Sequence, residues 1–408
     1  MMSIKPAFTE NKFIVTLIFV TSLFMLWGIA ITMGDVLNKH FQNVLGVSKA
    51  ESALVQFSIF GAYAIMGIPA GLFMKRFGYK KGVLLGLSLY ACGAFLFVPA
   101  ADAGSFDFFR VALFILACGL ATLETVAHPF AAALGDERSS DQRINFAQSF
   151  NGVGAVIGPL IGGYFILRTG AQDYADKLYS VKILYISIGA VISCVAIAFA
   201  FVKVPPFTES HPTTKERSLN NSYKNLFKHK HFIWAAIAQF FNVAAQGGTW
   251  AYFINYGSEK MNLNDETAAY YFSLSMFMMM AGRFIGTFLM RYIAANKLLS
   301  IFAAANILMS IIVAQSWGWP SFIALIMINF FFSIMFPTIF SLGLKDLGPL
   351  TQQASSFIVM GVVGGALFPP LMGIIADNDI ATAYYLPIIC YLVIFFFGFR
   401  LYKINPSD

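Results

Sequence analysis

The sequence predicts an all-α integral membrane protein with about twelve transmembrane helices. Of its 408 residues, 58% are hydrophobic and only 12% are charged, whereas soluble domains carry about a quarter charged residues. Apolar runs of about 20 residues, the length that crosses a bilayer, follow one another along the whole chain. The expected spans are residues 13–36, 53–74, 82–100, 107–134, 145–165, 183–202, 232–256, 268–290, 298–315, 321–342, 354–376 and 383–402.

The polar segments between the spans predict the domain organisation. The first apolar run follows a short polar stretch and lacks a small-residue cleavage site, so we expect a retained helix rather than a signal peptide. The longest polar stretch, residues 203–231, contains several prolines and most of the central basic residues. It predicts two six-helix halves, residues 1–202 and 232–408, joined by this linker. We expect no soluble domain at either end.

The distribution of Lys and Arg predicts the orientation of the helices. The net charge of +7 would suggest a nucleic-acid partner in a soluble protein, but here the charges lie in loops and no nucleic-acid partner is expected. With the N-terminus in the cytoplasm, most basic residues fall in cytoplasmic loops. The opposite side receives only Lys39, Lys49, Arg110, Arg168, Lys177, Lys182 and Lys260. This asymmetry follows the positive-inside rule and places both termini in the cytoplasm.

Apart from Asp107 at the first residue of its span, two acidic residues fall inside the expected spans, where an ionisable group is costly and indicates a function. Glu124 has apolar sequence on both sides, and His128 follows one helical turn later. Because burial disfavours the charged form of a carboxyl, Glu124 is a candidate to take up and release protons; a structural carboxyl held by its neighbours is the alternative. Asp35 lies close to the outer surface, where a plain interfacial aspartate is the alternative, but it shares a helix face with Trp27.

Neutral amides occur on two of the expected helices. Gln148 and Asn151 lie three residues apart on the fifth helix, and Gly154, Gly158 and Gly162 follow them at intervals of four. The glycines favour close helix packing. The amides match sugar hydroxyls as hydrogen-bond partners, although hydrogen bonding between helices is an open alternative.

The seventh helix carries a longer polar stripe, which consists of Gln239, Asn242 and Gln246 with Trp250 one turn further on. Amides interleaved with aromatic rings suit an uncharged, hydroxylated solute, whose hydroxyls bond the amides and whose C–H face stacks on a ring. No cluster of Lys or Arg lies in a midmembrane position, which argues against a phosphate or dicarboxylate substrate.

The sequence lacks the signatures of enzymes and metalloproteins. The four cysteines fall singly inside apolar runs and match no metal-ligand or redox spacing. No nucleophile elbow, phosphate loop or zinc spacing occurs. We therefore expect neither an enzyme, nor a cofactor, nor a bound metal.

Several segments together carry a family resemblance. These marks are LWG at 26–28, PAGLFMK at 69–75, LETVAHPF at 123–130, NFAQSFN at 145–151 and FPTIFSLG at 336–343. In addition, the glycine-to-arginine spacing of GLFMKR at 71–76 is repeated at the equivalent place in the second half by GTFLMR at 286–291. The chain resembles the fucose–galactose–glucose:proton symporter family of the major facilitator superfamily. Met74 or Lys75 replaces the aspartate usual in the superfamily's signature loop between helices two and three.

The resemblance implies the major facilitator fold and proton-coupled import of a hexose, which binds between the halves. Asp35 and Glu124 match the acidic residues that serve coupling and substrate binding in that family, and Gln148 and Asn151 match polar positions that line its cavity. Trp27 and the helix-seven amides match cavity positions.

Departures from the family concern the sugar. Where the fucose transporter of the family has paired asparagines, this chain has Ile31 and Thr32, and where it has asparagine before the helix-four proline, this chain has His128. These changes disfavour fucose and leave glucose, galactose, mannose and N-acetylglucosamine open.

The sequence thus predicts a monomeric, alternating-access symporter of a small neutral sugar and a proton, surrounded by membrane lipid in a bacterial inner membrane. The alternatives are a proton-coupled exporter of hydrophobic drugs and a transport-inactive sugar sensor. The predicted site comprises Asp35 and Glu124 for coupling, and for the sugar Trp27, Thr32, His128, Gln148, Asn151, Gln239, Asn242, Gln246 and Trp250.

Overall fold

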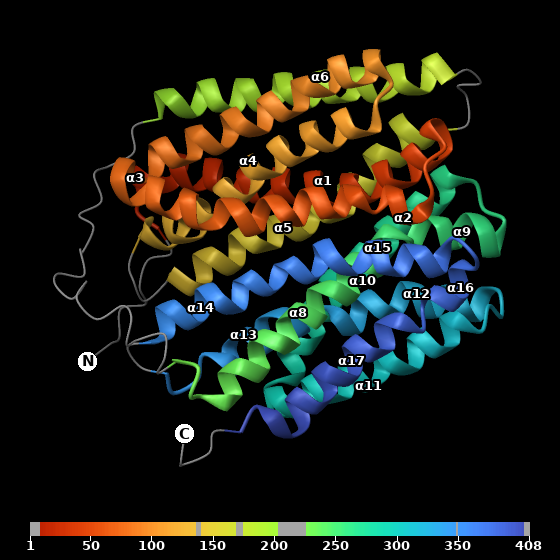
Figure 1. The fold of residues 1–408 in the computed structure, drawn as a ribbon. Coiled ribbons are helices and arrows are strands. Elements are labelled where there is room, and N and C mark those ends of the chain that lie inside the picture. Colours follow the sequence, from red (N-terminus) through yellow and green to blue (C-terminus); the bar gives the residue numbers. More distant parts are fainter. Residues whose placement is uncertain (1–8, 136–139, 169–173, 203–225, 348–349, 404–408) are drawn as a thin grey trace, which may run out of the picture. The chain divides into compact units, whose positions relative to one another are not determined.

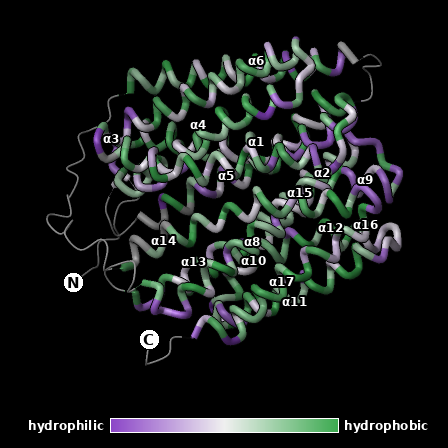
Figure 2. Tube along the Cα trace, viewed as in Figure 1, coloured by the Kyte–Doolittle hydropathy of each residue, from purple (hydrophilic) through white to green (hydrophobic). Residues whose placement is uncertain are grey.

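The computed structural model describes residues 9–135, 140–168, 174–202, 226–347 and 350–403. Within these residues the chain folds into helices and contains no β-strand (Figure 1). Hydrophobic residues dominate the helices, and hydrophilic residues gather near many helix ends and in α9 (Figure 2). This pattern is typical of helices whose middle parts lie in lipid.

The first part of the chain forms long helices. They are η1 (Asn11–Phe13), α1 (Ile14–Leu45), α2 (Lys49–Ser52), α3 (Leu54–Ala103), α4 (Phe106–Ala133), α5 (Ser140–Gly162), η3 (Gly163–Leu167) and α6 (Tyr174–Phe201). Within α3 the backbone turns at Gly78, whose φ of 82° favours glycine. Two membrane-length helices therefore follow one another here. The first, Lys49–Met74, consists of α2 and the first part of α3, and the second, Arg76–Ala103, is the remainder of α3.

The second part of the chain has more interruptions. Its helices are α8 (Lys230–Ala251), α9 (Phe253–Met261), α10 (Asp265–Leu289), α11 (Ala295–Ala314), α12 (Trp319–Phe332), α13 (Met335–Gly343), α14 (Thr351–Met360), η6 (Gly361–Val363), α15 (Gly364–Ala376), α16 (Ile380–Ala383), α17 (Leu386–Phe396) and η7 (Phe397–Leu401). The expected seventh helix is broken at Tyr252 between α8 and α9. The expected tenth helix is interrupted between α12 and α13, and the expected eleventh is interrupted at η6 between α14 and α15.

Eleven helices among the described residues are long and apolar enough to cross a membrane. They correspond to all the expected spans except the seventh. That span is α8, whose stripe of amides lowers its mean hydropathy. The prediction of an all-α membrane protein is confirmed.

The boundary of the first helix was predicted wrongly. The apolar pattern ends near residue 36, but α1 continues to Leu45. The polar side chains of Asn38, Lys39 and His40 are buried in this extension, so hydropathy alone gave too early an end. Asp35 consequently lies ten residues before the end of α1 and not at its terminus.

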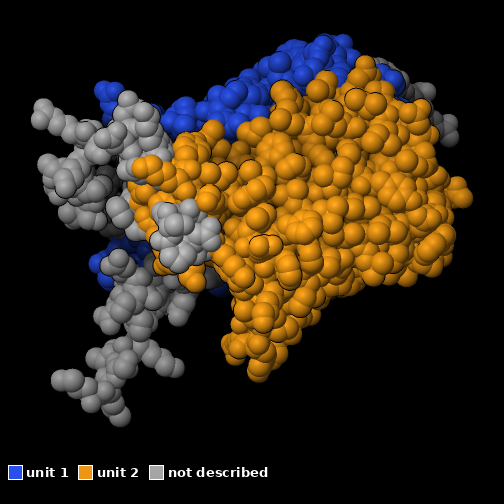
Figure 3. All heavy atoms as spheres, turned by 60° about the horizontal axis from the view of Figure 1, so that its bottom comes forward, with its two compact units in different colours: residues 1–47, 58–208 blue, residues 48–57, 209–408 orange. Residues whose placement is uncertain are grey.

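The chain divides into two compact units (Figure 3). Unit 1 comprises residues 1–47 and 58–208, and unit 2 comprises residues 48–57 and 209–408. Most of the predicted linker, residues 203–225, lies outside the described residues. The short segment 48–57 comes from the first half of the sequence but is part of unit 2.

In unit 1, α1 packs along α5 through glycine. A Cβ atom at Gly154 would collide with the carbonyl oxygen of Met25, and one at Gly28 would collide with the carbonyl oxygen of Asn151. A Cβ at Gly162 would lie 2.8 Å from Val36. The glycines therefore allow the two backbones to approach closely, as predicted for the fifth helix.

In unit 2, α8 packs along α15 in a similar way. A Cβ atom at Gly364 would collide with the carbonyl oxygen of Phe240, and one at Gly247 would lie 3.1 Å from the Cα of Gly365. Each unit thus contains one helix pair held together at glycines.

Candidate functional site

The candidate site lies in unit 1, where α4 faces α1. A small pocket there is lined by one carboxyl, two aromatic rings and apolar side chains. Its lining residues are Leu23, Phe24, Trp27, Leu123, Glu124 and Ala127. Glu124 is therefore placed beside Trp27, as expected if both contact the same solute.

The Glu124 carboxyl is available for new interactions. Its side chain is half-buried, and no described residue forms a hydrogen bond or an ion pair with it. A carboxyl in such apolar surroundings is poorly stabilised when charged. Either binding of a proton or hydrogen bonding to a polar ligand lowers this free-energy cost. The alternative of a carboxyl held by neighbouring hydroxyls receives no support from these contacts.

Trp27 is oriented by a residue that the sequence analysis did not single out. Its indole N–H donates a hydrogen bond to the hydroxyl of Tyr63 on α3. The Tyr63 hydroxyl also lies within electrostatic range of the Glu124 carboxyl. Since an indole N–H can only donate, the phenol oxygen accepts this bond and its own O–H remains free to donate elsewhere. Tyr63 thus orients the Trp27 ring and lies near the acidic group.

His128 is held between two helices. Its Nδ1 lies 2.9 Å from the backbone carbonyl of Glu124, and its Nε2 lies 2.6 Å from Nε2 of Gln148 on α5. A carbonyl oxygen only accepts, so Nδ1 carries the proton and the neutral ring accepts from the Gln148 amide at Nε2. The Phe24 ring packs edge-on against the imidazole, with the two ring centroids 4.9 Å apart. Glu124, His128 and Gln148 therefore form one connected group.

Asn151 and Thr32 serve the contact between α1 and α5. The Asn151 amide donates to the carbonyl of Phe24 at 3.3 Å, which is the interhelical alternative that the sequence left open. Thr32 is 1% exposed and donates to the carbonyl of Gly28, and a Cβ at Gly158 would collide with its hydroxyl. The structure thus places Thr32 inside the helix contact and not on the pocket wall.

Asp35 differs from Glu124 in its surroundings. The Asp35 residue is only 5% exposed and takes part in at least one interaction with another residue. It does not line the pocket that contains Glu124 and Trp27. Of the two predicted coupling carboxyls, Glu124 lines this pocket beside Trp27.

The amides of α8 lie inside unit 2. Gln239 and Asn242 are 0% exposed, and none of their side-chain polar atoms has a hydrogen-bond partner among the described residues. Gln239 packs where α8 meets Gly361. The structure therefore buries two residues of the predicted sugar-binding stripe, and only Gln246 of the three amides is partly exposed.

Trp250 is also engaged inside unit 2. Its indole N–H donates to Asn329 at 2.8 Å, and Asn329 in turn donates to Ser275 at 2.9 Å. Trp250 is 5% exposed. These bonds tie α8 to α12 and α10, which is a structural role.

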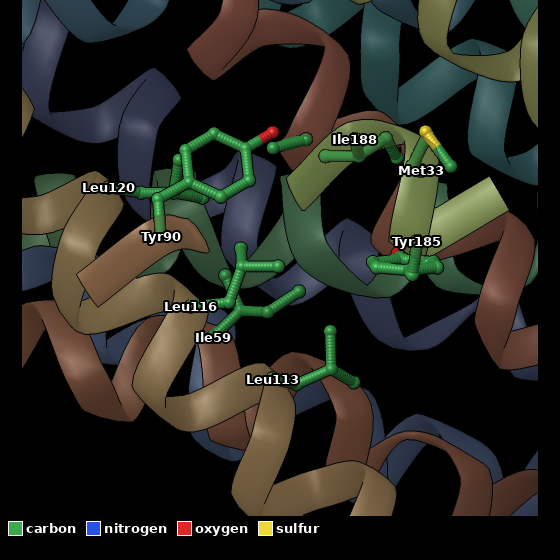
Figure 4. Close-up of a pocket in the computed structure, with 9 residues that line it drawn as sticks. Met33, Ile59, Tyr90, Leu113, Leu116, Leu120, Tyr185 and Ile188 are labelled. Carbon is green, nitrogen blue, oxygen red and sulfur yellow. The ribbon is translucent and has the colours of Figure 1, made fainter. Parts of the chain in front are cut away.

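A second pocket in unit 1 is apolar. It lies among α1, α3, α4 and α6, and its lining includes Met33, Ile59, Leu116, Tyr90 and Tyr185 (Figure 4). The two phenols are its only polar side-chain groups. This pocket lacks the amides and carboxyls that recognise a sugar.

The sequence analysis missed Tyr63 and Phe24. Tyr63 is a hydroxyl-bearing residue within an apolar span, a weak signal, because buried tyrosines are common in helix bundles. Phe24 carries no signal among 44 phenylalanines. Within the described part of the chain, no group of three or more His, Cys, Asp or Glu residues could hold a metal ion.

Membrane-length helices in two units, with a half-buried carboxyl that lines a pocket, indicate a polytopic membrane transporter. Comparison with known proteins specifies its class. Residues 13–369 match the model of the Major Facilitator Superfamily, and the chain belongs to that superfamily and, within it, to the family of the relatives described next.

Curated relatives align along nearly the whole chain. The L-fucose-proton symporter of Escherichia coli is 38% identical over 97% of this chain and 94% of its own length. The putative glucose/galactose transporter of Helicobacter pylori is 36% identical over 94% of this chain and 96% of its own length. The family resemblance drawn from the sequence motifs is confirmed, and the chain is a transporter rather than an enzyme.

Solved structures confirm the fold. A crystal structure of the E. coli fucose:proton symporter superposes with a TM-score of 0.71 at 36% identity, covering 97% of this chain and 100% of that one. The D-xylose-proton symporter has a TM-score of 0.76 at only 12% identity, over 96% of this chain and 97% of that one. The second likeness concerns the fold alone.

Proposed function

We propose that this protein is a proton-coupled symporter that imports a neutral hexose by alternating access. The observation that carries the proposal is the pocket of unit 1, where the unpaired Glu124 carboxyl lies beside the Trp27 ring. A ring stacks on the C–H face of a pyranose, and a carboxyl accepts hydrogen bonds from its hydroxyls. Similarity to fucose–proton and glucose/galactose transporters supports the same assignment.

Glu124 is the proton carrier in this proposal. Its carboxyl has no hydrogen-bond partner among the described residues, so its protonation state depends on the ligand and the solvent that reach the pocket. Protonation removes a charge that would be costly to move through the membrane, which permits the loaded carrier to change conformation. A proton moving down a potential contributes about 2.3 kcal/mol per 100 mV, enough to concentrate a neutral sugar. Asp35 has a supporting role, since it is buried and engaged.

The connected group of His128 and Gln148 selects the sugar. His128 receives one N–H of the Gln148 amide, which leaves the amide oxygen of Gln148 available to accept from a sugar hydroxyl. Gln246 is the partly exposed amide of α8 and remains a candidate for sugar binding. The replacement of a family asparagine by His128 favours glucose, galactose, mannose or N-acetylglucosamine over fucose.

The carrier acts as a monomer in a bacterial inner membrane, with both termini in the cytoplasm and lipid around its helices. The asymmetry of Lys and Arg between loops supports this orientation. The exposed apolar side chains of the described helices, such as Ile18, Ile65 and Phe284, suit contact with lipid tails.

Uptake of labelled sugars tests the function. The purified protein is reconstituted in liposomes, and L-fucose, glucose, galactose, mannose and N-acetylglucosamine are supplied with and without an inward proton gradient. We expect accumulation of one of the last four sugars that depends on the gradient. Sugar binding without any flux would instead identify a sensor, and gradient-driven export of hydrophobic compounds would identify a drug exporter.

A further inference from the structure

A short segment of the first half is anchored in unit 2. Residues 48–57 lie between α1 and the remainder of α3, and both of these neighbours belong to unit 1. The segment itself contains α2 and the start of α3, and α2 packs on α15. The contact therefore joins stretches of chain more than 300 residues apart.

The first contact is made by the Asp377 carboxylate, which follows the last residue of α15. Its Oδ1 accepts from the backbone N–H of Lys49 at 2.7 Å, and its Oδ2 accepts from that of Ala50 at 3.3 Å. These N–H groups belong to the first turn of a membrane-length helix, Lys49–Met74. A carboxylate at such a helix start forms charge-assisted hydrogen bonds.

The second contact is made by Lys49. Its ammonium donates to the carbonyl of Ala376 at 2.8 Å and lies 3.1 Å from the carboxylate of Glu259 on α9. The hydroxyl of Tyr252 lies 3.0 Å from the carbonyl of Lys49 and 2.9 Å from that of Pro369, so the two carbonyls share its single O–H. Lys49 thus uses both its side chain and its backbone to contact the later part of unit 2, residues 252–376.

The two charges suit the opposite helix better than their own. An aspartate at the C-terminal end of α15 is repelled by the dipole of that helix, and a lysine in the first turn of Lys49–Met74 is repelled in the same way. When the two helix ends meet, Asp377 lies at a positive helix start and Lys49 lies at a negative helix end. Both repulsions then become attractions. The two charges therefore stabilise the contact between the start of Lys49–Met74 and the end of α15, and they destabilise the separated helix ends.

Gly373 allows the approach. A Cβ atom there would lie 2.6 Å from the Cα of Ala50 and would collide with the hydroxyl of Tyr252. Any larger residue at this position would push the segment away from α15. Shape and charge therefore favour the same contact.

We propose that Lys49, Ala50, Tyr252, Glu259 and Asp377 form a latch that opens and closes once in each transport cycle. This inference rests on the proposed function, because alternating access requires the two halves of a carrier to move relative to each other. Segment 48–57 is covalently continuous with unit 1 at both of its ends. Movement of unit 1 away from unit 2 therefore strains the segment, and release of the latch relieves that strain.

Cysteine labelling tests the latch without any sugar. Ala50 is replaced by cysteine in a variant whose native cysteines, Cys92, Cys118, Cys194 and Cys390, are replaced by alanine. The rate of reaction with a maleimide is then measured in membranes. We expect Asp377→Asn to raise this rate about tenfold, because two hydrogen bonds to a charged group are weakened. Tyr252→Phe should raise it about threefold, because the neutral hydrogen bond that the carbonyl of Lys49 shares with that of Pro369 is lost.

Asp379→Asn is the matched control. Asp379 lies two residues after Asp377, and its carboxylate pairs with Lys260 at 2.6 Å. Lys260 and Thr382 hold the pKa of Asp379 below its usual range, so this control also removes a charge at neutral pH. Among the described residues, Asp379 forms its hydrogen bonds and ion pair with Thr382 and Lys260 and none with segment 48–57, and we expect the labelling rate to stay within a factor of about two.

Two outcomes would overturn the latch. Equal rates in the parent, Asp377→Asn and Tyr252→Phe would show that the segment stays with unit 2 throughout. Equal acceleration by Asp377→Asn and Asp379→Asn would show a general loosening of the loop. Neither outcome concerns sugar uptake by the parent protein, so failure of the latch and failure of the symporter assignment are separable.

Discussion

The two glycine-packed helix pairs differ in what they do with polar side chains. Beside α1 and α5 in unit 1, Glu124, His128 and Gln148 are half-buried, and Glu124 lines a pocket. On α8, packed on α15 in unit 2, Gln239 and Asn242 are fully buried without hydrogen-bond partners among the described residues. Similar backbone packing thus supports an accessible chemical site in one unit and an enclosed polar interior in the other.

This difference assigns separate tasks to the units. A half-buried carboxyl can exchange protons and meet a solute, whereas an enclosed, unpaired amide costs free energy and cannot. We infer that proton coupling and most of the sugar contacts belong to unit 1. Unit 2 contains Gln246, the partly exposed amide of α8, and the contact between Asp377 and residues 49–50 at the end of α15.

The largest expected effect on stability comes from replacing a contact glycine in either helix pair, α1 with α5 or α8 with α15. Gly154→Ala and Gly364→Ala each place a Cβ against a backbone carbonyl, which cannot move aside. We expect each to destabilise the protein by about 3 kcal/mol or more, measured as a lower thermal midpoint in detergent. Gly67→Ala is the control, since a Cβ there meets no atom within 4 Å. Tolerance of both alanines would disprove the close packing.

Gln148→Leu and Asn242→Leu test whether the half-buried polar group of unit 1 binds sugar while the enclosed amides of unit 2 do not. Gln148→Leu removes the partner of His128, and we expect sugar affinity to fall about tenfold to a hundredfold. Asn242→Leu replaces an enclosed, unpaired amide by an apolar group of similar size, so thermal stability should stay equal or rise. Equilibrium binding of the transported sugar and thermal unfolding measure the two effects.

A loss of sugar binding in Asn242→Leu, with unchanged stability, would contradict the division of tasks. The amide would then reach the sugar in another conformation of the carrier. Gln239→Met offers an independent check of the same point, because Gln239 is equally buried.

The smallest expected effect concerns the bond between Trp27 and Tyr63. Trp27→Phe and Tyr63→Phe should each weaken sugar binding by about 1 kcal/mol, since one hydrogen bond that orients the ring is lost. The double variant should lose less than the sum of the two single losses, because both remove the same bond. Strict additivity would mean that Tyr63 does not orient Trp27.

The sequence predicted the fold well because membrane helices have a strong signal. Apolar runs gave nearly every helix, and only the polar α8 falls short of the hydropathy of the rest. The end of α1 was missed because Asn38, Lys39 and His40 are polar but buried. Burial of polar groups depends on neighbouring helices, which a hydropathy pattern does not contain.

The site was harder to predict than the fold. Glu124 was identifiable as a carboxyl in an apolar run, and its neighbour His128 follows one turn later. The amides of α8 share one face, but only tertiary packing decides whether that face is open, and here it buries Gln239 and Asn242. Tyr63 and Asp377 act through contacts with residues distant in sequence, so no local pattern points to them.

The central claim is that Glu124 couples the proton to the sugar. The direct test compares Glu124→Gln with the parent in liposomes, measuring both uphill accumulation under an inward proton gradient and exchange of labelled for unlabelled sugar at equal pH. We expect accumulation to fall to the level without a gradient while exchange continues, because a glutamine resembles the protonated carboxyl and cannot release a proton. Full uphill accumulation by Glu124→Gln would contradict the account.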